Sequence, residues 1–114
     1  MAETEKKSKT KIDFDYIVEN TDTLAVLLAL AEEANEVSQA ALKYARALEL
    51  VKHPTPVSAE EALKNIQEEF DDLYIVILVA KSKNLVNPWI VSNKKIERWA
   101  DRLRKAKQPL SSAE

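Results

Sequence analysis

Apolar residues recur at three- and four-residue spacing along most of this chain. That spacing is typical of helices with one buried face. The segments that show it are residues 22–51, 58–84 and 92–107. Neither glycine nor proline interrupts any of them. The pattern therefore predicts an all-α fold with three main helices.

Capping residues mark where the first two helices begin. Thr21 or Asp22 precedes the first apolar run and supplies a side-chain oxygen for the free N–H groups of a first turn. Ser58, followed three residues later by Glu61, forms a capping-box pattern at the start of the second. Two closely spaced prolines within residues 52–57 predict a break between these helices.

The two ends of the chain lack helical periodicity. Residues 1–11 are polar and rich in lysine and predict a disordered tail, and residues 108–114 predict a second flexible tail. Residues 12–107 form the expected domain. Within it, the apolar residues of 13–20 predict a short helix or docking segment.

Carboxylates interrupt the apolar faces of the first two helices. Because a helix turns about 100° per residue, residues that share a face can be found from their spacing. In the first helix an arc of about 80° holds Val26, Ala29, Glu33, Glu36, Ala40 and Ala47, with Glu32 at its edge. In the second an arc of about 100° holds Ala62, Asn65, Glu69, Asp72, Val76 and Val79. The opposite stripe of the second helix predicts a conventional core face of Leu63, Ile66, Phe70, Leu73 and Ile77.

Acidic residues on packed faces need a compensating charge. An ionised carboxylate removed from water costs several kcal/mol unless it is paired or binds a metal. A single acidic run is usually a solvated helix face, but a matching pair on a second helix favours a bound cation. Hard oxygen ligands of this kind suit Mg²⁺ or Mn²⁺.

Composition excludes several other chemistries. Glycine is absent, which excludes the P-loop and the dinucleotide-binding fingerprint. Cysteine is absent and His53 is the single histidine, so a zinc-thiolate site and a Ser-His-Asp triad are not expected. A net charge of −2 gives no general attraction to nucleic acid. Without a membrane-length apolar run or an apolar signal region, we expect no membrane partner and a cytoplasmic location.

The first two helices carry apolar residues on more than one face. The surplus includes Leu27, Leu28, Leu30, Ile75, Leu78 and Val79. We therefore expect a homo-dimer or homo-tetramer, an oligomeric helical bundle whose active site lies between facing helices. Trp89 and Trp99 are expected in a core or an interface rather than stacked on a base.

Three motifs resemble the all-α nucleoside triphosphate pyrophosphohydrolases, in particular the MazG-like group. They are Glu32-Glu33-x-x-Glu36, Glu69-x-x-Asp72 and Asn93-Lys94-Lys95-Ile96-Glu97-Arg98. The resemblance covers roughly residues 14–104. The phosphoribosyl-ATP pyrophosphohydrolases of histidine synthesis share the acidic motifs, whereas Asn93, Lys95 and Arg98 favour the MazG-like branch.

The resemblance implies a Mg²⁺-dependent hydrolase that converts a nucleoside triphosphate and water to the monophosphate and pyrophosphate. Its metal ligands would be Glu33, Glu36, Glu69 and Asp72, and Glu32 would be an outer partner or accept a proton from water. The phosphate-binding residues would be Asn93, Lys95 and Arg98, the arginine in bidentate fashion. A helical interaction module, with the acidic motifs a relic or a structural metal site, remains the alternative of a different class.

Overall fold

The computed structural model describes residues 2–49 and 58–107. Helix is the only regular secondary structure in those ranges. They are α1 (Ala2–Glu19), α2 (Thr23–Leu48), α3 (Ala59–Ser82) and α4 (Asn93–Lys107). The all-α prediction is confirmed, but the described residues form four helices instead of three main ones. The predicted break at 52–57, which includes His53, and the tail at 108–114 lie outside the described residues.

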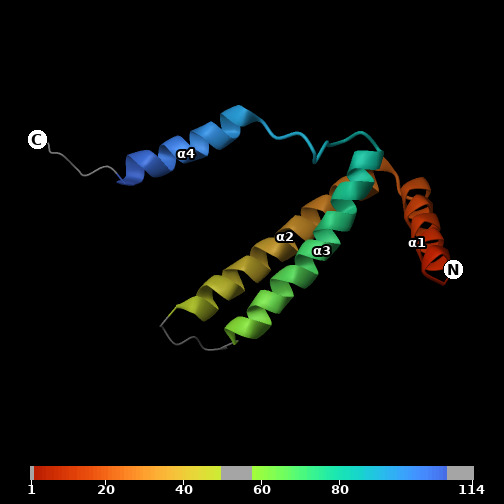
Figure 1. Cartoon of the computed structure of the whole chain (residues 1–114), viewed down its shortest axis with the longest axis horizontal. Coiled ribbons are helices and arrows are strands. Elements are labelled where there is room, and N and C mark those ends of the chain that lie inside the picture. The colour runs from red at the N-terminus through yellow and green to blue at the C-terminus, as the bar shows by residue number, and fades with distance from the viewer. Residues whose placement is uncertain (1, 50–57, 108–114) are drawn as a thin grey trace, which may run out of the picture.

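Helices α2 and α3 form an antiparallel hairpin, and α1 lies beside one end of it (Figure 1). Helix α4 leads away from the hairpin and contacts none of the other described helices (Figure 1). The radius of gyration is 20.0 Å, against about 13 Å for a compact chain of this length. None of the described helices is long and apolar enough to cross a membrane.

Both predicted N-caps are present. The Asp22 carboxylate accepts a hydrogen bond from the Ala25 N–H at 2.7 Å, and the Ser58 hydroxyl accepts one from the Glu61 N–H at 3.1 Å. Each bond satisfies a backbone donor that the helix leaves unpaired, which stabilises the fold by about 0.5–2 kcal/mol.

Helix α3 ends in a Schellman motif. Asn84 takes a left-handed conformation, with φ of 61°. The Leu85 N–H then donates to the Ala80 carbonyl at 3.0 Å and the Asn84 N–H to the Lys81 carbonyl at 2.9 Å. The reversal returns Leu85 to the hairpin, where it packs against the buried cluster of Val26, Val79 and Ala80.

Helix α1 begins at Ala2, so the prediction of a disordered tail over residues 1–11 differs from the structure. No glycine or proline interrupts it, and ion pairs one turn apart support it: Lys9–Asp13 at 3.5 Å and Lys11–Asp15 at 3.0 Å. The expected docking role of 13–20 is confirmed, because Phe14 and Val18 pack against the buried cluster at the end of the hairpin.

The core within the described residues is small. Its buried apolar members are Val26, Ala40, Ala62, Val79 and Ala80. The predicted core stripe of α3 is only partly covered: Leu63 and Phe70 are exposed and its other three residues are half-buried, because α2 packs instead on the face that carries Ala62 and Ala80. Val79 differs from the prediction in the opposite direction. It was expected at an oligomer surface, but it is buried in the core of the chain itself.

Candidate metal centre

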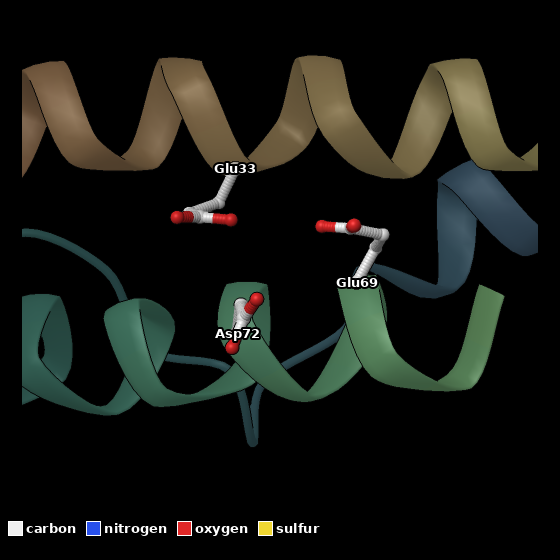
Figure 2. Close-up of side chains that lie close together, drawn as sticks. All are labelled: Glu33, Glu69 and Asp72. Atoms are coloured by element: carbon white, nitrogen blue, oxygen red, sulfur yellow. The ribbon is translucent and has the colours of Figure 1, made fainter. Parts of the chain in front are cut away.

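The helix hairpin brings three of the predicted metal ligands together. Carboxylate oxygens of Glu33, Glu69 and Asp72 lie within 4.8 Å of one another. Figure 2 shows Glu33 extending from α2 toward α3 and Glu69 extending from α3 toward α2, with Asp72 one turn further along α3. Helical spacing selected these three residues as facing the partner helix, and the structure agrees with that selection.

Seven-residue spacing explains why the acids face each other. On α2, Glu33 lies midway between buried Val26 and buried Ala40. On α3, Glu69 follows buried Ala62 by seven residues. Residues seven apart lie on the same side of a helix after two turns and form the seam between paired helices. A carboxylate on each seam therefore points at the partner helix.

The three carboxylates have no cationic partner among the side chains that the structure describes, those of residues 9–49 and 58–107. The ion pairs Lys9–Asp13, Lys11–Asp15 and Asp101–Arg104 involve other acids, and on α3 the Asp71 carboxylate accepts a hydrogen bond from Gln67. Glu33 and Glu69 are half-buried, and Asp72 is exposed. The site is thus a concentrated negative charge, covered by helices on one side and open to solvent on the other.

The environment raises the pKa of Glu33 above its ordinary value of 4.5. Partial removal from water against α3 is the largest cause, followed by the negative charges of Asp72 and Glu69 and then of Glu36 and Glu32. A divalent cation at this place would act in the opposite direction, because it stabilises the ionised carboxylates.

The donor set fits Mg²⁺ or Mn²⁺. These ions prefer oxygen ligands, and octahedral Mg²⁺ holds them at about 2.0–2.1 Å, so ligands on opposite sides of the ion are about 4.2 Å apart. Three ligands of one octahedral ion include at least two adjacent pairs, whose oxygens are about 2.9 Å apart. The three carboxylates lie within 4.8 Å of one another, so their side chains would have to move closer together to share one ion.

Two other predicted acids lie beside this group without joining it. Glu36 and Glu32 are exposed on α2, near enough to Glu33 to raise its pKa. Glu36 lies outside the group of Glu33, Glu69 and Asp72, and its assignment as a fourth ligand stays a prediction. Asn65, half-buried one turn before Glu69 on the same face of α3, offers a further oxygen that sequence analysis did not select.

The predicted phosphate-binding residues lie elsewhere. Asn93, Lys95 and Arg98 are on α4, which has no contact with the hairpin in one chain. Lys95 and Arg98 line a shallow hollow on the surface of α4 itself, together with Trp99, Arg102 and Leu103. The structure of the single chain therefore does not bring these cations to the carboxylates.

Compared with protein-family models, with curated proteins and with solved structures, the chain gives no match. The relation to the MazG-like group thus rests on the three motifs alone.

Proposed function

We propose that this chain is a Mg²⁺-dependent nucleoside triphosphate pyrophosphohydrolase of the MazG-like type that its motifs resemble. The observation that carries the proposal is the meeting of Glu33, Glu69 and Asp72 between two helices without a cationic partner among the described residues. Three carboxylates in this arrangement suit a divalent cation, and a divalent cation beside an open surface suits a phosphate substrate.

The proposed reaction is attack of water on the α-phosphorus of the triphosphate. The new bond joins the water oxygen to the α-phosphorus, and the bond to the bridging oxygen breaks as pyrophosphate leaves. When bound, Mg²⁺ would neutralise phosphate charge and lower the pKa of the attacking water. Glu33, Glu69 and Asp72 would hold the ion. Glu32, exposed beside them and outside the converging group, is the residue we assign to accept the proton.

Substrate binding requires cations that the hairpin itself does not place at the site. We assign Lys95 and Arg98 to the phosphates, with Asn93 beside them, on the strength of the third motif. They can reach a carboxylate cluster only if α4 of another subunit lies along the carboxylate side of a hairpin, opposite the stripe of Leu63 and Phe70, an arrangement that a homo-tetramer would allow. A phosphoribosyl-ATP substrate would use the same cluster for the same bond cleavage.

A non-catalytic interaction module is the second candidate function. It is favoured by the exposed apolar side chains of α4, among them Ile96, Trp99 and Leu103. In that case the acidic cluster would hold a structural ion or none.

Release of pyrophosphate from a panel of ribo-, deoxyribo- and damaged nucleoside triphosphates and phosphoribosyl-ATP tests the proposal. We expect pyrophosphate together with the monophosphate, and no orthophosphate, only when Mg²⁺ or Mn²⁺ is present. Asp72→Asn and Glu36→Gln should each lower kcat by on the order of 10²-fold, since each removes the charge of a predicted metal ligand and so weakens metal-ion catalysis.

A matched control separates this role from a general effect of charge. Glu68 is exposed on α3 directly before Glu69 and outside the converging group, so Glu68→Gln should retain full activity. Wild-type protein without activity on any member of the panel, or Asp72→Asn as active as Glu68→Gln, would refute the enzyme and favour the interaction module.

A further inference from the structure

Helix α4 has an apolar face that nothing among the described residues covers. Ile96, Trp99 and Leu103 recur at the spacing of one helix face, and Trp99 is 70% exposed. The rest of the helix is strongly basic, with seven lysines and arginines against two acids, a net charge of +5. Lys95 and Arg102 lie next to the apolar face and share a hollow with Trp99 and Leu103.

The hairpin carries a complementary surface. On α3 the side chains of Leu63, Phe70 and Tyr74 form an exposed apolar stripe, and the rings of Phe70 and Tyr74 stack with centroids 6.2 Å apart. By helical spacing, Glu60, Asp71 and Lys64 follow one edge of this stripe, which therefore carries two acids and one base. Helices α2 and α3 together hold nine acidic and four basic residues, a net charge of −5.

The segment between α3 and α4 directs α4 away from its own hairpin (Figure 1). Leu85 is fixed against the buried cluster, and the Asn87 side chain accepts a hydrogen bond from the Trp89 N–H at 3.0 Å. The Lys81 ammonium lies 6.0 Å from the centre of the Trp89 ring, within the range of a cation–π contact. These contacts hold Leu85 and Trp89 beside the end of α3, and α4 leads away from that end (Figure 1).

The exposed area is large enough for a stable interface. The chain exposes 9740 Å², whereas a compact monomer of its 12.9 kDa mass exposes about 6300 Å². The excess of about 3400 Å² belongs to the whole chain, and a standard protein interface needs roughly 800 Å² from each partner. A second copy of the chain supplies a partner with both the apolar stripe and the opposite charge.

We infer that α4 of one copy docks on the Leu63–Phe70–Tyr74 stripe of a second copy, with the basic edge of α4 against the acidic edge of α3. In a two-fold dimer each copy gives its α4 and receives the partner's. This interface does not depend on the proposed enzyme activity, and the experiments that test it use no nucleotide.

The natural absence of cysteine allows a direct cross-linking test in the full-length chain. Phe70→Cys protein and a mass-tagged Trp99→Cys protein are mixed and treated with a flexible bis-maleimide. We expect a covalent product of one light and one heavy chain. The control variant is Gln39→Cys, at an exposed residue of α2. When it replaces Phe70→Cys in the mixture, the yield of cross-linked product should fall at least about tenfold if α4 binds the stripe of α3.

Three other results of these experiments would overturn the inference. Products of two Phe70→Cys chains would show that hairpins pair with each other. Linkage within one chain of the Phe70→Cys, Trp99→Cys double variant, without linkage between chains, would show that α4 folds back. A wild-type monomer by light scattering that sediments with vesicles of phosphatidylcholine and phosphatidylserine would assign the basic face to lipid.

Substitution on α4 gives an independent measurement. Trp99→Asp removes the central apolar side chain of an exposed helix, so the hairpin should stay folded while the dimer dissociation constant rises at least about tenfold. Ile12→Asp, at a comparably exposed apolar residue of α1, is the matched control and should leave the dimer intact. Equal effects of the two variants, or no dimer in the wild type, would also overturn the inference.

Discussion

In the folded chain Glu33 lies near four other carboxylates. Partial burial, then Asp72, Glu69 and the acids of α2, raise its pKa above 4.5. The folded state therefore binds this proton more tightly than the unfolded state, and the stability of the metal-free chain falls as pH rises from 4.5 through the raised pKa. Glu33→Gln should raise the melting temperature at pH 7 in chelator, and the gain should vanish below about pH 4. Thermal melts across this range check it, and an unchanged or lower melting temperature at pH 7 would contradict it.

Side-chain directions on one helix were predictable from sequence, but the rotation of the partner helix was not. Helical spacing selected Glu33, Glu69 and Asp72, and these three converge. The same spacing selected Glu36, which is exposed, because α3 packs along the seam through Val26, Glu33 and Ala40 and leaves Glu36 at its edge. Small side chains on both helices decide which residues lie on the seam. The rotation of α3 against α2 therefore cannot be derived from the sequence of one helix alone.

At the scale of the elements, Asn84 is the residue that stops α3 and turns the chain toward α4. Its φ of 61° is strained for most residues and tolerated by asparagine and glycine. We predict that Asn84→Val lowers the free energy of unfolding by about 1–2 kcal/mol, whereas Asn84→Gly changes it little. Urea unfolding of both variants measures this. Equal stability of the two would show that the left-handed turn does not hold the end of α3.

Local signals predicted the helix starts, and the long-range arrangement had no such signal. Asp22 and Ser58 cap α2 and α3 as expected because a cap depends on a few neighbouring residues. The helical start of α1 was missed because residues 2–11 are polar and have no apolar face to reveal it. The separation of α4 from the hairpin depends on the turns between Lys83 and Ser92, which periodicity does not describe.

At the scale of the whole molecule, opposite charges of +5 on α4 and −5 on the hairpin should make self-association depend on salt. Raising NaCl from about 0.05 M to 0.5 M shortens the range of electrostatic attraction several-fold, so the dimer should weaken while its apolar contacts persist. Sedimentation at both salt concentrations measures the change. Association that strengthens with salt would indicate an interface dominated by uncharged faces, such as the leucine-rich outer side of α2.

The proposed function depends most on the carboxylates of α2 and α3 forming a divalent-cation site, and thermal unfolding with and without Mg²⁺ tests that directly. A ligand that binds only the folded state stabilises it, by about 2.7 kcal/mol when its concentration is a hundred times its dissociation constant. At fixed protein concentration, millimolar Mg²⁺ or Mn²⁺ should therefore raise the melting temperature of the wild type and of Glu68→Gln. It should raise that of Glu69→Gln and Asp72→Asn much less. A wild-type melting temperature unchanged by either ion, or variants that respond as the wild type does, would contradict the proposed metal centre.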